Sequence, residues 1–119
     1  MLRDDFAKQF ASEWISAWNA HDLDAVLSHY ADDFEMSSPV MVQMGVSPSG
    51  RLHGKSAIRV YWQKALQLIP DLKFELVSVL TGVESITLYY KGARSRLVAE
   101  VFFFNSQGCV TQALAHYAG

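Results

Sequence analysis

The chain contains little cysteine and no long apolar run. Cys109 is the single cysteine in 119 residues, so the sequence excludes an internal disulfide framework and is typical of a reducing compartment. No apolar stretch approaches the length of a membrane span, and the charged start MLRDDFAKQF is unlike the apolar core of a secretory signal. We therefore expect a cytoplasmic protein that does not bind membranes.

An excess of charge of one sign is also missing. Ten Lys and Arg residues face twelve Asp and Glu residues, which gives a net charge of −2 with the two signs interspersed. This balance argues against nucleic acid and anionic membranes as partners. Half of the residues are apolar and 18% are charged, as in globular proteins, so we expect residues 1–119 to form a single domain.

The sequence lacks the usual metal, nucleotide and nucleophile motifs. No two of the four histidines have the spacing of metal ligands on a helix, and no cysteine accompanies them. Gly50 and Gly54 precede Lys55-Ser56, but only three residues separate the glycines, whereas a phosphate-binding loop needs four. No serine lies in a nucleophile elbow. We expect no metal and no cofactor.

Helical periodicity occupies much of the first seventy residues. In residues 3–20 the apolar side chains Phe6, Phe10, Trp14 and Trp18 recur at intervals of four, which predicts an amphipathic helix. A short second helix is predicted to follow, with Tyr30 at the end of its apolar face. A third helix is predicted from about residue 55 to 69, where Pro70 ends it.

Strand patterns fill the rest of the chain. We predict strands at about 34–38, 72–80, 85–92, 97–105 and 109–118, with a loop at 40–54. Gly108 suits the positive φ of the last hairpin turn. Helices followed by a run of strands predict an α+β fold in which three N-terminal helices cover one face of a mainly antiparallel sheet.

The strand at 97–104 is apolar on both faces except for Glu100. Antiparallel strands usually leave one face to water. Because the helices can cover only one face, we expect a homodimer in which a second copy packs on the outer face of the sheet.

Glu100 is the most informative residue of that strand. By alternation its side chain shares a face with Val98, Phe102 and Phe104. Burial of a carboxylate is costly unless it is paired, hydrogen-bonded or protonated. Either Glu100 has a structural partner, such as an arginine or a group across the sheet, or it is an acid in a pocket with a raised pKa.

Several segments resemble one known family. They are Trp18-Asn19-Ala20-His21-Asp22-Leu23-Asp24-Ala25, Tyr30-Ala31-Asp32-Asp33, Ser38-Pro39-Val40 and Gly54-Lys55-Ser56-Ala57-Ile58. They are similar to ketosteroid isomerase and SnoaL-like polyketide cyclases, in the nuclear transport factor 2-like superfamily. This resemblance implies a cone-shaped roll, also called cystatin-like, with an apolar cavity at its wide end.

The resemblance also assigns roles to residues. Its general base falls on Ser38, which cannot accept a proton at neutral pH, so ketosteroid isomerisation is not expected. The tyrosine that stabilises the oxyanion in ketosteroid isomerase corresponds to Trp14, and the second acid of that enzyme corresponds to Glu100. One of its supporting tyrosines is retained as Tyr30. We therefore predict Glu100, Trp14 and Tyr30 as catalytic groups. The predicted pocket residues are Trp18, Phe34, Met36, Ser38, Trp62, Phe74, Phe102, Ala113 and Tyr117, with a lid at Met41, Val42 and Met44.

Three functions stay open at this point. The first is an isomerase, cyclase or hydratase that uses acid–base chemistry on a small hydrophobic carbonyl compound. The second is a protein that binds a small hydrophobic molecule without converting it. The third is a dimerisation or partner-docking module whose interior is filled core.

Overall fold

A computed structural model describes residues 2–119. The helices are α1 (Asp4–Asn19), α2 (Leu23–Leu27), α3 (Pro39–Gln43) and α4 (Lys55–Leu68), with a 3-10 turn, η1 (Ala93–Ser95). The strands are β1 (Tyr30–Ser37), β2 (Arg51–His53), β3 (Glu75–Thr81), β4 (Ser85–Lys91), β5 (Leu97–Phe104) and β6 (Val110–Tyr117).

Helix α1 follows the periodicity of its sequence. Its buried face consists of small and aromatic side chains: Ala7, Phe10, Ala11, Trp14, Ala17 and Trp18. Asp4 and Asp5 lie in the first turn, where negative charge interacts favourably with the helix dipole. The helix ends just before His21, whose φ of 57° leaves the helical region. The predicted first helix is confirmed.

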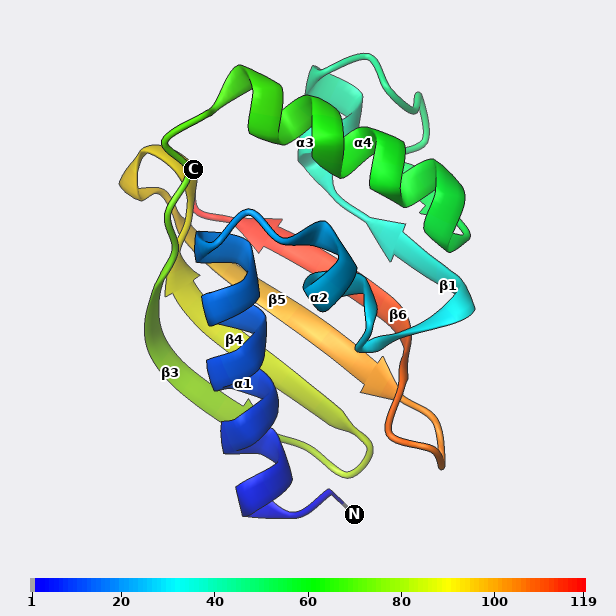
Figure 1. Cartoon of the computed structure of the whole chain (residues 1–119), viewed down its shortest axis with the longest axis vertical. Coiled ribbons are helices and arrows are strands. Elements are labelled where there is room, and N and C mark those ends of the chain that lie inside the picture. Colours follow the sequence, from blue (N-terminus) through cyan, green and yellow to red (C-terminus); the bar gives the residue numbers. More distant parts are fainter. Residues whose placement is uncertain (1) are drawn as a thin grey trace.

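The six strands form one sheet in the order β2-β1-β6-β5-β4-β3. All neighbours are antiparallel except β1 and β6, which run parallel. Figure 1 shows the sheet curving behind α1 and α2, with α4 crossing above its upper end. This is the predicted α+β cone of helices on a curved, mainly antiparallel sheet.

Two predictions about the middle of the chain are wrong. Tyr30 does not end the second helix; it begins β1 and pairs with Val110 of β6. The segment 40–54 is not a plain loop, because it contains α3 and β2. Ser38 caps α3 by accepting a hydrogen bond from the Val40 amide, and Pro39 starts the helix, where its missing N–H costs nothing.

Strand β5 alternates as predicted. Val98, Glu100, Phe102 and Phe104 are buried, whereas the intervening side chains are partly or fully exposed. Phe102 and Phe104 both contact Phe10 of α1 edge-to-face, with ring centroids 5.0 Å apart. The turn before β6 contains Gly108 at φ 77°, as predicted. These contacts fix α1 across the concave face of the sheet.

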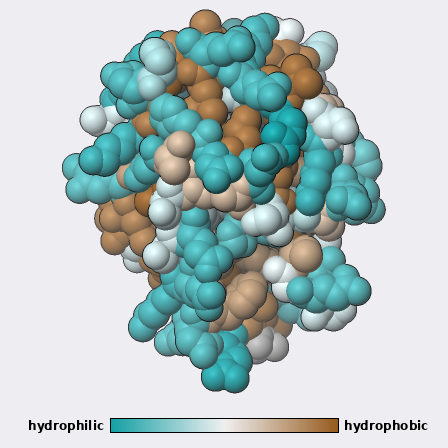
Figure 2. Space-filling model, viewed as in Figure 1, coloured by the Kyte–Doolittle hydropathy of each residue, from teal (hydrophilic) through white to brown (hydrophobic). Residues whose placement is uncertain are grey.

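The outer surface of the sheet retains apolar side chains. Phe103 of β5 and Leu80 of β3 are exposed, and Val101 is partly so. Figure 2 shows a largely hydrophilic helix-bearing face with hydrophobic side chains at the edge where β3 lies.

Within residues 2–119, none of the helices combines the length and apolar character that a membrane crossing requires.

Candidate functional site

A cavity of about 670 Å³ lies between the concave face of the sheet and helices α1 and α4. Most of its exposed lining residues, including Arg94, Arg96 and Gly119, belong to the β4–β5 turn and the C-terminus, which Figure 1 shows close together at one corner of the molecule. The cavity therefore opens at this corner. Its aromatic wall is made by Trp14, Trp18, Tyr61, Trp62, Phe74, Tyr90 and Tyr117. The cavity is therefore largely apolar, with a small number of polar atoms on its wall.

Glu100 is one of the residues that line this cavity, and it is 3% exposed. It lies opposite Leu88 of β4 and Ala115 of β6 in the sheet register. The hydroxyl of Tyr90, two residues along β4, donates a hydrogen bond of 2.8 Å to its Oε1 atom. Its Oε2 atom is buried and has no hydrogen-bond partner among residues 2–119.

Burial determines the acidity of Glu100. Loss of water raises the pKa of this carboxyl from 4.5 to about 7, and the hydrogen bond from Tyr90 opposes the rise. In the described part of the chain no arginine forms an ion pair with Glu100. Of the alternatives raised by the sequence, a hydrogen bond across the sheet and a raised pKa are both present. A carboxyl that titrates near neutral pH can give or take a proton.

The tyrosines around Glu100 remain protonated. Burial, followed by the charge of Glu100, raises the pKa of Tyr30 and Tyr90 well above 10. Burial raises the pKa of Tyr61 to about 12, against the effect of a contact with Ser38, and it also raises the pKa of Tyr117. These hydroxyls are therefore hydrogen-bond donors and not bases.

The indole groups differ in what their N–H bonds contact. Trp14 donates from Nε1 to the Tyr30 hydroxyl at 2.9 Å, so its donor is used inside the fold. Trp18 also lines the cavity, and its buried Nε1 has no acceptor in the part of the chain that the structure describes. Trp18 Nε1 and Glu100 Oε2 are thus a buried donor and a buried acceptor without partners, on two residues that line the same cavity from α1 and β5.

The sequence profile of the SnoaL-like domain matches residues 11–101, most of the chain. This chain belongs to the SnoaL-like family. It is 58% identical to a SnoaL-like protein of unknown function from Burkholderia thailandensis E264, with a TM-score of 0.95 over 98% of each chain. A comparison with curated proteins gives no match.

More distant structures share the fold of this SnoaL-like domain. An NTF2-like protein of unknown function from Burkholderia pseudomallei K96243 is 17% identical, with a TM-score of 0.75 over 95% of this chain and 91% of that one. The epoxide hydrolase/cyclase-like enzyme SalBIII, which has a role in pyran ring formation in the polyether salinomycin, is 15% identical. Its TM-score is 0.74 over 99% of this chain and 95% of that one. At these identities the likeness shows the fold alone.

The SnoaL-like cavity includes some of the predicted site residues and not others. Seven of the twelve line it: Trp14, Trp18, Met36, Trp62, Phe74, Glu100 and Tyr117. The other five, Tyr30, Phe34, Ser38, Phe102 and Ala113, are buried behind its wall. Tyr30 stays connected to the cavity through its hydrogen bond from Trp14.

The three residues of the predicted lid lie in different environments. Met41 is fully buried, Val42 is half exposed, and only Met44 lines the cavity. Ser38 uses its hydroxyl to cap α3 and is 3% exposed. Ser38 is not among the residues that line the cavity.

Sequence reasoning missed Tyr90, the hydrogen-bond partner of Glu100. The signal was present in the hairpin formed by β4 and β5: Tyr90 pairs with Val98, so it lies diagonally next to Glu100 on the same face. The sequence analysis also missed Tyr61, Arg94 and Arg96 in the lining. Across residues 2–119 there is no cluster of three His, Cys, Asp or Glu side chains able to hold a metal ion.

Proposed function

We propose that this SnoaL-like protein is an acid–base enzyme for small, mainly apolar carbonyl compounds, of the isomerase, cyclase or hydratase type. The observation that carries this proposal is a pair of buried, unpartnered atoms on residues that line the cavity, Glu100 Oε2 and Trp18 Nε1. Burying one unpartnered polar group costs free energy, so two such groups on one cavity indicate that a ligand completes them.

In the proposed reaction Glu100 moves a proton. Its carboxylate removes a proton from the carbon next to the substrate carbonyl, and the electrons of that C–H bond form an enolate. The indole N–H of Trp18 donates a hydrogen bond to the oxygen on which negative charge develops. In a substrate with a β,γ double bond the enolate extends into a dienolate, and the protonated Glu100 returns the proton to the γ-carbon. The double bond thereby moves to the α,β position, so the substrate is isomerised and the Glu100 carboxylate is regenerated.

Tyr90 supports the role of Glu100 in this scheme. Its hydroxyl holds one carboxylate oxygen at 2.8 Å and leaves the other free for the substrate. A pKa of about 7 places the carboxyl where a general base works best at neutral pH. The general base that the resemblance to ketosteroid isomerase places at Ser38, after β1, is in this scheme located on β5, which β6 separates from β1 in the sheet.

A second candidate function is binding of a hydrophobic small molecule without turnover. The aromatic lining and the missing base at Ser38 favour it. In that case Glu100 and Trp18 would serve only to orient a ligand that carries one donor and one acceptor. The two candidates differ in whether the bound molecule exchanges a proton.

Hydrogen–deuterium exchange tests the proposal directly. The probe is para-phenylacetophenone, a neutral biphenyl ketone, and proton NMR in deuterated buffer follows the loss of its methyl signal. We expect the wild-type protein to accelerate this exchange at pH 8 and to do so less as the pH falls below 7, where Glu100 becomes protonated. Glu100→Gln should abolish the acceleration.

Glu84→Gln is the matched control, because it neutralises an exposed carboxylate in the β3–β4 turn, away from the cavity. It should exchange the ketone at the wild-type rate. Binding of the ketone without any exchange would support the binding function instead. Full activity in the Glu100→Gln variant would remove Glu100 from the mechanism.

A further inference from the structure

Two arginines lie at the mouth of the cavity. Arg94 is in the turn between β4 and β5, Arg96 directly precedes β5, and both line the cavity. Glu100 lines the same cavity, but its side chain is buried. The cavity therefore carries guanidinium groups at its opening and a carboxyl group in its interior.

Arg96 is held in place by its neighbours. Its Nε donates to the carbonyl oxygen of Ala118 at 2.8 Å, and its guanidinium lies 4.9 Å from the centre of the Tyr117 ring. A guanidinium has five N–H donors, and only the Nε donor is used in this contact. The terminal nitrogens of an already oriented guanidinium remain for a ligand, which reduces the entropy lost on binding.

Arg94 has no ionic partner. In residues 2–119 no carboxylate lies within ion-pair distance of it, whereas Lys91 nearby pairs with Glu75 at 3.8 Å. Arg94 and Ser95 both adopt left-handed backbone conformations, with φ of 57° and 62°. Two consecutive non-glycine residues in this region are unusual and cost free energy. The turn thus maintains a strained conformation that places an unpaired cation at the mouth.

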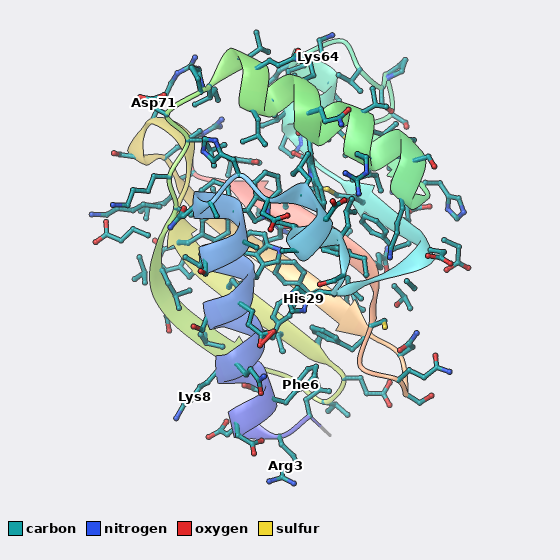
Figure 3. All side chains as sticks on the ribbon, viewed as in Figure 1. Arg3, Phe6, Lys8, His29, Lys64 and Asp71 are labelled. Carbon is teal, nitrogen blue, oxygen red and sulfur yellow. The ribbon has the colours of Figure 1, made fainter. Side chains whose placement is uncertain are left out.

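The surroundings of the mouth are positive as well. A groove shares Leu72, Phe74 and Arg94 with the cavity and carries Lys73 and Lys91. Its acids are Asp71, which Figure 3 shows on the connection after α4, and Glu75. Four cationic side chains thus lie at the mouth with two acidic side chains and the terminal carboxylate of Gly119, although the whole chain has a net charge of −2. Such a local excess attracts anions to the opening.

We propose that the natural substrate is an elongated apolar molecule with one anionic group, which Arg94 and Arg96 bind while Glu100 acts on its other end. This proposal rests on the proposed function and adds the class of substrate to it. Arg96 lies in extended backbone directly before β5 and Glu100 lies four residues further along, within β5, so their Cα atoms are about 13 Å apart. The anion and the reacting carbon should therefore lie at opposite ends of a body about two rings long.

Two matched probes test this proposal. One is a biphenyl with an acetyl group at one end and a carboxylate at the other; the second replaces the carboxylate by the neutral carboxamide. Calorimetry measures binding of each, and deuterium exchange of the acetyl group measures turnover. We expect the carboxylate to bind about tenfold more tightly than the amide, since charge-assisted hydrogen bonds are the stronger ones. A phosphonate analogue distinguishes a site for carboxylates from one for phosphate groups.

The Arg94→Gln and Arg96→Gln variants should each reduce this preference, because they should weaken binding of the carboxylate more than binding of the amide. Lys64→Gln is the control, because it removes one positive charge from the outer side of α4, where Figure 3 shows Lys64 pointing away from the molecule. It should keep the wild-type preference. Thermal denaturation of each variant checks that the fold is intact, and the same comparison with the phosphonate identifies the preferred anion.

The outcomes separate this inference from the proposed function. If carboxylate and amide bind and exchange equally, and the arginine variants change neither, the anion site is wrong while acid–base chemistry at Glu100 stands. If the probes bind with the expected preference but none exchanges, the anion-binding part stands and the enzyme does not. If neither probe binds, both the proposed function and this inference fail.

Discussion

Glu100 is a buried carboxyl group whose negative charge costs the folded protein free energy. The folded pKa is raised to about 7, against 4.5 for the ordinary group. Between these two values the folded protein holds a proton that the unfolded chain has released. The contribution of this proton to stability is complete below pH 4.5 and is lost as the pH rises through 7, because the slope of stability with pH follows the difference in bound protons.

The free energy of unfolding should therefore fall by an amount on the order of 3 kcal/mol between pH 4.5 and pH 8 because of Glu100 alone. Urea denaturation at several pH values measures this change. Glu100→Gln should lack this component, so the difference between the two proteins isolates it. If the free energy of unfolding changes with pH by the same amount in the wild type and in the variant, Glu100 has an ordinary pKa.

Trp18 should act on the reaction and not on the fold. Trp18→Phe keeps the ring packing against Trp62 and Phe74 but removes the unpartnered Nε1 donor. Loss of one oxyanion donor should lower the rate of ketone exchange by about 100-fold with little change in KM.

Trp14→Phe provides the comparison for Trp18. It removes a donor that is already bound to the Tyr30 hydroxyl, so the expected cost is about 1 kcal/mol of stability and not a comparable loss of rate. Thermal denaturation and exchange kinetics on both variants distinguish these effects. Equal rate losses in the two would contradict the role assigned to Trp18.

At the scale of single residues, only part of the site could be predicted from the sequence. The inward direction of Glu100 follows from strand alternation alone, and the structure agrees. The partners could not be predicted, because they depend on contacts between distant segments. The N–H of Trp14 is used by Tyr30, sixteen residues away, and Trp18 is left free, although the two indoles look equivalent in the helix pattern.

At the scale of elements, Asn19 links the end of α1 to the start of the sheet. Its side chain donates to the carbonyl of Phe74 at 3.0 Å and accepts from the amide of Phe74 at 2.7 Å. Phe74 in turn stacks on Trp14, with ring centroids 5.6 Å apart, and lines the cavity. Asn19 therefore positions one wall of the site.

Asn19→Ala should lower the free energy of unfolding by about 2 kcal/mol, since it removes both hydrogen bonds and leaves two backbone groups without partners. Asn19→Asp retains the acceptor for the Phe74 amide and should lose roughly half as much. Chemical denaturation of the two variants measures the difference. A loss below about 0.5 kcal/mol for the alanine variant would show that the link does not matter.

The elements themselves differ in how well the sequence predicts them. Helices α1 and α4 carry long periodic patterns that survive in the structure. Strand β2 has three residues, too few for a strand pattern, and helix α3 lies in a segment whose glycines and prolines indicated a loop. The pairing of β2 with β1 and the cap from Ser38 determine them.

At the scale of the whole molecule, the outer face of the sheet is the main unassigned surface. Ala99, Val101 and Phe103 of β5 point outward, and Leu114 of β6 pairs with Val101 beside them. We propose that a second copy covers this face to give a homodimer, because the helices lie on the opposite face (Figure 1). The sequence indicated this through a strand that is apolar on both sides.

Phe103→Lys should convert the proposed dimer into a monomer, because it places a charge in the middle of the apolar face. Val83→Lys is the control, since Val83 is exposed in the β3–β4 turn, outside the central strands. Sedimentation velocity at micromolar concentration measures the mass of each. A monomeric wild-type protein would disprove the dimer without affecting the cavity.

The cavity, its carboxyl group and the proposed chemistry all depend on the ionisation of Glu100. Carbon-13 NMR of the side-chain carboxyl, assigned by comparison with Glu100→Gln, measures this ionisation in the intact protein. We predict a titration midpoint near the pKa of about 7 that burial imposes. A midpoint near 4.5 would place Glu100 in contact with water and would contradict an acid–base role inside the cavity.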